Sequence, residues 1–363
     1  MKNFNLDKQW KMRVGLKKLT LILVGFGALI WFLILVIPKP VRASYPCQQA
    51  AFPISFTNTG ACQADKQNIV DPFQPDNTPP PQEVNGYRLV FNDEFNHEGP
   101  MKEEFWRPEV GFRRNGEDQW YQPENGICTG GRLIITGKRE KVKNTTYDPE
   151  SKNWRNKREY AEYTSSSFIT KEAYHQKYDS IIMEMRAKLP LKSGGEDDYG
   201  IWPAFWTTGA GPWPDGGEID IMEYYNGYMM ANFAYKGNRE TLWFGNRAEG
   251  APNSYLKNII EGKAIGFNAD PDWLKKYHIW KLIGDGKWLT IYLDDVFMSR
   301  IELDTKNVDN SKLEYPFKGN TCNFWINLAI GGDKHPNKEK LAQTQMPRMY
   351  EIDYARIYVK KSK

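Results

Sequence analysis

The stretch Trp202–Tyr225 reads WPAFWTTGAGPWPDGGEIDIMEYY, and its second half decides the fold. From Glu218 onward, acidic and apolar side chains alternate, which is the period-two pattern of a half-buried β-strand. Glu218 and Asp220 are two residues apart and therefore share one face of that strand. The isoleucine that follows each of them points to the other face, into the core. The segment thus predicts a strand that places two carboxyl groups side by side.

Glu223 lies five residues after Glu218, which is the wrong parity for the same face. One extra residue in the strand, a β-bulge around Ile221 or Met222, would return Glu223 to the face of the other two acids. Bulges of this kind are common beside active sites. We therefore expect three carboxyl groups to converge in one row.

Three converging carboxyl groups are costly, because like charges raise one another's pKa values. Retaining glycoside hydrolysis uses such a pair about 5 to 5.5 Å apart: one group attacks the anomeric carbon, and the other, kept protonated, donates to the leaving oxygen. The intervening Asp220 would hydrogen-bond the attacking group and hold its geometry. The pattern also fits two other structures, an acidic face on an exposed strand and a calcium site built from three carboxylates.

Tryptophans 202, 206 and 213 lie close to these acids in the sequence, and Gly216 and Gly217 would permit close approach of the backbone. A flat ring suits the apolar face of a sugar. Tryptophans are more often core residues than ligand platforms, so we expect one or two of these three to contact a sugar.

From residue 86 onward the chain consists of short apolar alternations separated by turn residues, such as YRLVFNDEF, GRLIITGKRE and CNFWINLAI. Runs of this kind, rich in Ile, Val, Tyr, Phe and Trp, indicate an all-β sandwich or barrel. Only residues 254–262 and 271–277 suggest short helices. The pair Asp294-Asp295 within KWLTIYLDDVFMSRIEL predicts a hairpin turn between two strands.

The N-terminal part has the organisation of a membrane-inserted segment. Residues 1–18 carry six basic side chains and would stay in the cytoplasm under the positive-inside rule. Residues 19–37 form an uncharged run of nineteen, just long enough to cross a hydrocarbon core of about 30 Å as a helix. They predict either a retained membrane anchor or a signal peptide cleaved after Ala43, which would release a secreted protein. Residues 38–85 would be an exported, proline-rich linker, and residues 86–363 the folded domain.

Charge and cysteine content narrow the partners and the compartment. There are 49 basic and 45 acidic side chains, and the near-neutral balance beyond residue 18 argues against nucleic acid. Nothing requires more than a monomer. Cysteines 47, 62, 128 and 322 fit an oxidising compartment, although sequence does not fix their connectivity. Cys47 with Cys62 would close a short loop and Cys128 with Cys322 a long one, while the second pair fits buried thiols equally well.

Several segments resemble one known family. GEIDIMEYY, preceded by WPAFW, is similar to the catalytic strand of glycoside hydrolase family 16, in its laminarinase-like branch with the Glu-x-Asp-x-x-Glu pattern. LVFNDEF, ENGICTGGRLIITGKRE and INLAIGG resemble further strands in the same order, so the resemblance covers roughly residues 86–360. It implies a β-jelly-roll sandwich of two antiparallel sheets, of the concanavalin A-like type, with the substrate in a cleft on the concave face.

The resemblance also implies roles for single residues. Glu218 corresponds to the nucleophile, Asp220 to its assisting acid and Glu223 to the general acid/base. The implied substrate-contacting residues are Trp202, Trp206, Arg186 and Asn125. No organic cofactor is required. The family's structural calcium site corresponds to segments that contain Glu94 and Asp353, although either could be an ordinary surface carboxylate.

The implied reaction is retaining endo-hydrolysis of a β-linked polysaccharide, first of all a β-1,3-glucan of the laminarin type. Transfer to a sugar hydroxyl in place of water would make the protein a transglycosylase. Laminarinases carry a His-Tyr or His-Trp pair where this chain reads MANFAYKGN, so a mixed-linkage glucan or a marine galactan (agar, porphyran or carrageenan) stays open.

A sulfated galactan would require basic residues along the cleft. The candidates are Arg113, Arg114, Arg239 and Arg247. The insertion at residues 143–158 looks private to this chain, and substrate choice in a sandwich is made by such loops. Two non-enzymatic functions also remain open: a carbohydrate-binding or sensor protein with an inactive site, and a structural protein of the cell envelope.

Overall fold

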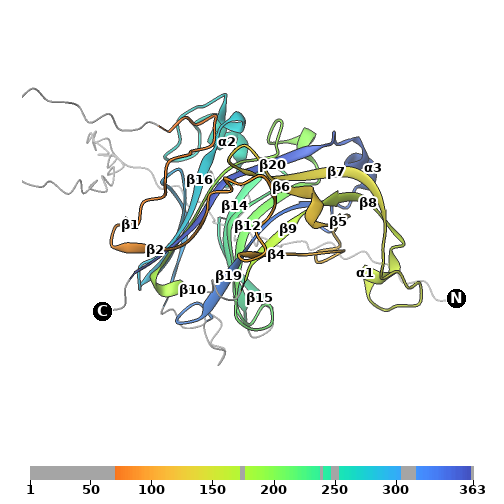
Figure 1. Cartoon of the computed structure of the whole chain (residues 1–363), viewed down its shortest axis with the longest axis horizontal. Helices are drawn as coiled ribbons and strands as arrows, with labels where there is room; N and C mark the ends of the chain where they lie inside the picture. Colours follow the sequence, from red (N-terminus) through yellow and green to blue (C-terminus); the bar gives the residue numbers. More distant parts are fainter. Residues whose placement is uncertain (1–69, 172–175, 238–239, 247–252, 304–315, 361–363) are drawn as a thin grey trace, which may run out of the picture. The chain divides into compact units, whose positions relative to one another are not determined.

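The chain folds into two β-sheets packed face to face (Figure 1). The computed structural model describes residues 70–171, 176–237, 240–246, 253–303 and 316–360. One sheet has twelve strands and the other has eight.

The strands of the 12-stranded sheet are β1 (Glu83–Val84), β2 (Tyr87–Asp93), β3 (Gly99–Pro100), β5 (Gln119–Tyr121), β6 (Gly126–Cys128), β7 (Leu133–Lys143), β8 (Tyr160–Ser165), β11 (Ile181–Lys188), β16 (His278–Gly284), β17 (Trp288–Leu293), β18 (Val296–Glu302) and β20 (Arg348–Lys360). The main order is β18–β17–β16–β11–β20–β7–β6–β3. Pairing is antiparallel except between β5 and β8, which run parallel.

The strands of the 8-stranded sheet are β4 (Trp106–Pro108), β9 (Ser167–Thr170), β10 (Gln176–Lys177), β12 (Ile201–Gly209), β13 (Glu218–Tyr225), β14 (Tyr228–Lys236), β15 (Thr241–Gly245) and β19 (Thr321–Ile330). Their order is β15–β14–β13–β12–β19–β9–β4, all antiparallel, with β10 beside β19.

The helices are short and lie in the connections. They are α1 (Trp154–Lys157), α2 (Leu256–Ile260), α3 (Lys338–Gln343) and the 3₁₀ turns η1 (Pro123–Asn125), η3 (Tyr178–Ser180), η4 (Glu196–Asp198) and η5 (Trp273–Lys275). The two helices that the sequence predicts, at 254–262 and 271–277, are confirmed as α2 and η5. The predicted hairpin turn is confirmed as well, because Asp294 and Asp295 join β17 to β18 and both have positive φ, at 48° and 61°.

The main hydrophobic core lies between the facing sides of the two sheets. Met183 and Met185 on β11 meet Ile219 and Ile221 on β13 and Phe324 on β19, and all five side chains are buried. Burying an apolar side chain of this size stabilises the fold by about 1.5–3 kcal/mol. The prediction of an all-β sandwich of two antiparallel sheets is therefore confirmed.

No helix in the described residues is long and apolar enough to cross a membrane. The predicted cytoplasmic segment 1–18, the apolar run 19–37 and linker residues 38–69 lie outside the described residues.

The end of the predicted linker, residues 71–76, is bound to the domain. Arg186 on β11 donates hydrogen bonds to two carbonyl groups of this segment, at 2.8 and 3.0 Å. The backbone N–H of Asp76 donates to the Asp353 carboxylate at 3.1 Å. The polypeptide thus already contacts the 12-stranded sheet some fifteen residues before the boundary predicted at residue 86.

Arg186 does not face the substrate cleft, and the role implied for it by the resemblance is wrong. On β11 the odd-numbered side chains enter the core, so Arg186 lies on the outer face of the 12-stranded sheet. Its guanidinium donates to Asp353 on β20 at 2.5 Å, and only 4% of the arginine is exposed. Arg186 is therefore a structural residue that joins two strands and the segment 71–76.

Glu94 and Asp353 do not fit the calcium site that the resemblance implies. Glu94 accepts two hydrogen bonds from Arg356, at 2.6 and 3.0 Å, and Asp353 accepts from Arg186. Calcium requires six to eight oxygen ligands, whereas a guanidinium only donates. Within the residues that the structure describes, no group of three or more His, Cys, Asp or Glu side chains is placed to hold a metal ion.

Cys128 and Cys322 are two buried thiols, not a disulfide. Cys128 lies on β6 and Cys322 on β19, so they belong to different sheets. The Cys128 Sγ atom is 3.7 Å from the Met101 Sδ atom, and burial raises the pKa of this thiol to about 12. Of the two alternatives for this pair, the long-loop disulfide is wrong. Cys47 and Cys62 lie outside the described residues.

We predict that Arg186→Leu lowers the free energy of unfolding by about 3–5 kcal/mol, because it leaves the buried Asp353 carboxylate without its cation. The double variant Arg186→Leu/Asp353→Leu should recover at least half of that loss, since an apolar pair leaves no buried charge. Urea unfolding followed by tryptophan fluorescence measures both. A single variant as stable as the parent would contradict this account of the ion pair.

Candidate active site

The face of the 8-stranded sheet that points away from the core carries a row of three acids. On β13 the side chains of Ile219, Ile221, Met222 and Tyr224 enter the core. The pairing of β13 with β14 shifts register between Asp220 and Glu223. The predicted β-bulge is thereby confirmed, and Glu218, Asp220 and Glu223 line one pocket.

This pocket opens into a larger cavity of about 470 Å³ that crosses the strands of the sheet. The strand order places Trp243 of β15 toward one end and Asn232 of β14 next to it. Glu218 and Glu223 lie in the middle. Arg114, from the loop before β5, contributes to the other end, beyond β12 and β19. We call this cavity and the acid pocket together the cleft.

Trp202 and Glu223 are held together by a hydrogen bond. The indole Nε1 of Trp202 on β12 donates to Glu223 Oε1 at 2.7 Å. Only 4% of Trp202 is exposed, and its ring lies 5.4 Å from that of Tyr225. An N–H directed at one carboxyl oxygen fixes the orientation of the group and leaves the second oxygen for another contact.

Trp206 is also part of the cleft, and its ring has neighbours on several sides. It stacks on Trp325 with the ring centroids 4.6 Å apart, and the guanidinium carbon of Arg114 is 5.2 Å from its centroid. Its Nε1 donates to the Asn327 side chain at 2.7 Å. Trp206 is therefore a fixed part of the wall.

Trp213 and Trp243 offer more open aromatic surface. Trp213 is 54% exposed and Trp243 is 37% exposed, and both line the cleft. An exposed ring beside a cleft is suited to stack on the apolar face of a sugar. The structure thus brings all three tryptophans of the sequence prediction to the cleft, together with a fourth.

A buried acid–base network supports Arg114. Its guanidinium bonds to the Glu109 carboxylate, which also accepts from Ser167 Oγ at 2.7 Å. Burial alone would raise the pKa of Glu109, but Arg114 and the Ser167 hydroxyl hold it below its usual value. Glu117, which lines the acid pocket, has its pKa raised by burial to about 7. The Glu109 carboxylate therefore offsets the charge of Arg114 in the wall.

Asn125 does not reach the cleft, so the role implied for it by the resemblance is wrong. Its side chain is 2% exposed and donates to the Thr136 carbonyl at 2.7 Å and to Thr164 Oγ1 at 3.0 Å. Gln122 Nε2 donates to its Oδ1 at 2.8 Å. Asn125 is a structural amide that fixes η1 against β7 and β8.

Several cleft residues were missed by reasoning from the sequence. The polar, charged and aromatic ones are Asn115, Glu117, Arg155, Thr208, Tyr225, Asn232, Trp243, Asn327 and Lys334. For Asn327 a signal existed, because CNFWINLAI on β19 alternates core and polar side chains and so predicts its outward face. Trp243 and Lys334 carry no comparable local signal.

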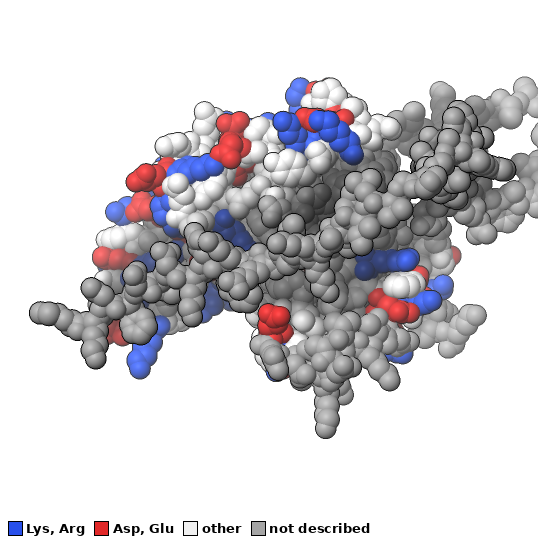
Figure 2. All heavy atoms as spheres, turned by 180° about the vertical axis from the view of Figure 1, so that it is seen from behind, with Lys and Arg blue, Asp and Glu red and all other residues white. Residues whose placement is uncertain are grey.

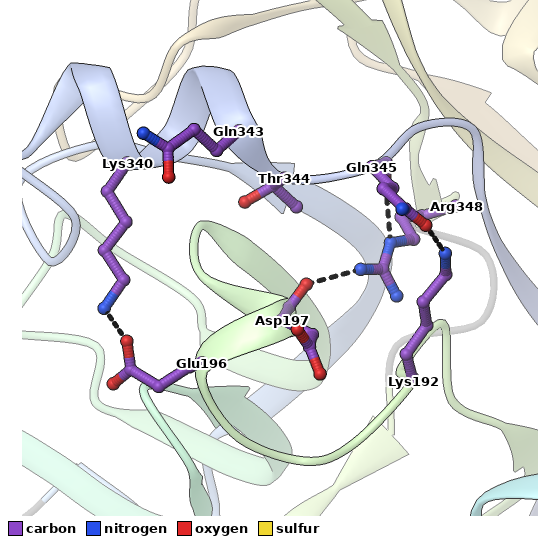
Figure 3. Close-up of a pocket in the computed structure, with 8 residues that line it drawn as sticks. All are labelled: Lys192, Glu196, Asp197, Lys340, Gln343, Thr344, Gln345 and Arg348. Atoms are coloured by element: carbon purple, nitrogen blue, oxygen red, sulfur yellow. Dashed lines mark hydrogen bonds and ion pairs between the residues drawn. The ribbon is translucent and has the colours of Figure 1, made fainter.

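A second hollow, of about 510 Å³, lies beside α3, and its lysines and arginine already bond to other groups of the protein (Figure 3). Lys340 pairs with Glu196, Lys192 bonds to the Gln345 amide, and Arg348 donates to the Asp197 carbonyl at 2.6 Å. This hollow has no row of converging carboxyl groups. In Figure 2 as well, basic and acidic side chains are intermixed on the face that grey atoms do not cover.

His335 is buried behind the cleft. Its ring lies 5.9 Å from Trp202 and 5.1 Å from Tyr199, its Nδ1 donates to the Gly331 carbonyl at 2.8 Å, and its Nε2 has no hydrogen-bond partner in the described part of the chain. Burial lowers its pKa to about 4, although the hydrogen bond to Gly331 acts in the opposite direction. The imidazole is therefore neutral in the folded protein near neutral pH.

Comparison with known proteins agrees with this geometry. A family model described as "XgeA-like, catalytic GH16 domain" matches residues 140–252. A glucan endo-1,3-beta-glucosidase of Cryptopygus antarcticus is 33% identical over 262 residues, which are 68% of this chain and 81% of that protein. A beta-glucanase of Rhodothermus marinus is 36% identical over 149 residues, 38% of this chain and 44% of the relative.

A solved structure is similar as well. It comes from work on endo-acting O-glycanases that members of the human gut microbiota express to initiate mucin breakdown. Its TM-score is 0.62 at 26% identity, and the match covers 78% of this chain and 94% of the other. The chain spans about half the length of several curated relatives that it matches.

We predict that His335 makes stability depend on pH between about 4 and 6.5. The unfolded chain binds a proton on this histidine below pH 6.5 while the folded protein does not, so stability falls as pH decreases through this window, by up to about 3 kcal/mol. His335→Gln should flatten this part of the curve in chemical unfolding measured at several pH values. His97→Gln is the control. If the free energy of unfolding depends on pH equally in both variants, His335 is not the source of the pH dependence.

Proposed function

Because the chain belongs to glycoside hydrolase family 16, we propose that it is a retaining endo-hydrolase of a β-linked glucan with β-1,3 linkages. The observation that carries the proposal is the bulge in β13, which puts Glu218, Asp220 and Glu223 on the floor of the cleft. The similarity to a beta-glucanase and to a glucan endo-1,3-beta-glucosidase supports the substrate class.

The first half of the reaction uses two carboxyl groups. Glu218 attacks the anomeric carbon as a carboxylate, and the glycosidic C–O bond breaks while a bond forms from Glu218 to that carbon. Glu223, protonated at this stage, gives its proton to the leaving oxygen. The products are one free sugar end and a covalent glycosyl-enzyme.

The second half reverses the roles. Glu223, now a carboxylate, takes a proton from a water molecule whose oxygen attacks the anomeric carbon, and Glu218 is released. A sugar hydroxyl in place of water would give transglycosylation. The hydrogen bond from Trp202 fixes the orientation of the Glu223 carboxyl group that handles the proton.

The cleft geometry supports cleavage inside a polymer. The cavity crosses β15, β14, β13, β12 and β19 and has the acids in its middle. Sugar units can therefore lie on both sides of the cleaved bond, with Trp213 and Trp243 available for stacking on one side.

We predict that Glu218→Gln and Glu223→Gln each lower kcat/KM on laminarin by at least about 10³-fold, because each removes a group that acts in the transition state. Reducing-sugar release by the full-length chain measures this. Azide should restore turnover to Glu218→Ala and yield a glycosyl azide, since a small anion can replace the attacking carboxylate.

The matched control is Glu339→Gln, an exposed glutamate on α3 outside the cleft, which should keep full activity. If wild-type protein binds laminarin, lichenan or agarose but cleaves none, the hydrolase proposal is wrong and a binding or sensing function replaces it.

We also propose that residues 19–37 hold the chain in a membrane with the domain outside the cytoplasm, on the strength of the basic residues that precede this apolar run. Full-length protein should remain with membranes after carbonate extraction, and a variant that lacks residues 1–43 should not. Intact, unprocessed protein in the cytoplasmic fraction would contradict the proposal. Mature protein beginning at Ser44 would favour a cleaved signal.

A further inference from the structure

Within the described residues, three cations line the cleft that holds the proposed catalytic acids: Arg114, Arg155 and Lys334. Arg114 is neutralised by Glu109, as described above. In the described part of the chain, neither Arg155 nor Lys334 has a carboxylate within 4 Å. The hollow beside α3 differs in this respect, because its lysines and arginine are paired with groups of the protein.

Arg155 reaches the cleft from the predicted insertion at residues 143–158. Strands β7 and β8 continue as a hairpin arm to Lys143 and Tyr160, and α1 lies in the loop between them (Figure 1). The side chain of Asn153 caps α1 by accepting from the backbone N–H of Arg155 at 3.1 Å. Arg155 is thus placed by a short ordered helix.

The arm is fixed to the loop that carries Arg114. Arg158 donates to the carbonyls of Glu117 and Gly116, at 2.6 and 2.8 Å, and Trp154 packs near Phe112 with the ring centroids 6.0 Å apart. The Arg155 side chain itself donates from Nε to the Arg113 carbonyl at 2.6 Å. Its terminal nitrogens are thereby held at the rim of the cleft.

Lys334 lies in the loop that follows β19. Its carbonyl accepts a hydrogen bond from Asn226 Nδ2 at 3.0 Å, which ties this loop to the turn after β13. Its Nζ atom is 5.6 Å from the centroid of the Tyr225 ring, which also lines the cleft. The ammonium group therefore lies near the Tyr225 ring in the wall of the cleft, and no carboxylate of the described residues pairs with it.

Resting on the proposed hydrolase function, we infer that the polymer cut by this protein carries anionic substituents, sulfate esters or carboxylates, which pair with Arg155 and Lys334. The acids on β13 repel an anionic chain, and cations at the rim offset that repulsion where a substituent comes close. An arginine fork suits a planar carboxylate or a sulfate equally, so the two share one recognition chemistry.

The test uses the full-length chain with four polymers: curdlan oligosaccharides, carboxymethyl-curdlan, sulfated curdlan and neutral laminarin. We expect kcat/KM to be higher for a charged polymer than for the neutral ones and to fall as salt increases, because salt screens exposed charges. Comparing kcat/KM on carboxymethyl-curdlan and on sulfated curdlan shows whether the cleft prefers a carboxylate or a sulfate substituent. Arg155→Gln and Lys334→Gln should each lower the charged-to-neutral ratio of kcat/KM by about 2- to 5-fold.

The matched control is Lys157→Gln, which removes the same charge from an exposed residue of the same helix that does not line the cleft. Its charged-to-neutral ratio should equal that of the wild type. Arg155→Gln could instead change kcat/KM by the same factor on all four polymers, or shift only the pH–rate profile. Either result would mean that the cations act on the enzyme's own acids, and it would overturn the inference.

Binding separates this inference from the proposed function. Affinity electrophoresis of the full-length Glu218→Gln variant in gels containing each polymer measures retention without turnover. Preferential retention by a charged polymer that Arg155→Gln weakens would support the inference even if the wild type cleaves nothing. Equal retention by charged and neutral polymers would overturn it, even if hydrolysis of laminarin is observed.

Discussion

The cleft depends on the parity of strand β13. Side chains of a regular strand alternate between core and solvent, so an acid five positions after another would be driven into the apolar interior. The one extra residue between Asp220 and Glu223 prevents this, and Ile221 and Met222 both enter the core at that level. The same irregularity is present where β12 meets β13, between Phe205 and Trp206. One local backbone deviation therefore decides which carboxyl groups face a substrate.

The outer faces of the two sheets have different roles, one structural and one in the cleft. The outer face of the 12-stranded sheet carries buried ion pairs, such as Arg186 with Asp353, that hold strands and the segment 71–76 together. The outer face of the 8-stranded sheet carries the acids, the aromatic rings and cations whose charges are not all matched. Trp206, which forms part of the cleft wall, is held in place by stacking on Trp325 and by a hydrogen bond to Asn327. Rigid support of this kind keeps reacting groups in place without a conformational step.

Local patterns predicted much of the fold and the centre of the site. The alternation of apolar and polar residues predicted the strands, and the five-residue spacing of Glu218 and Glu223 predicted the bulge. The Asp294-Asp295 pair predicted a hairpin turn. The failures have a common physical cause, because a partner distant in the chain decides the role of a polar residue. Arg186 meets Asp353 across 167 positions, and Glu94 meets Arg356 across 262. Nothing within a few residues of either arginine indicates whether it will pair inside the protein or face a ligand.

The position of residues 71–76 affects how a polymer can reach the cleft. Residues 71–76 run along the outer face of the 12-stranded sheet, and the cleft is on the opposite side of the sandwich. A long polymer can therefore lie across the cleft from β15 to β19 without contacting residues 71–76.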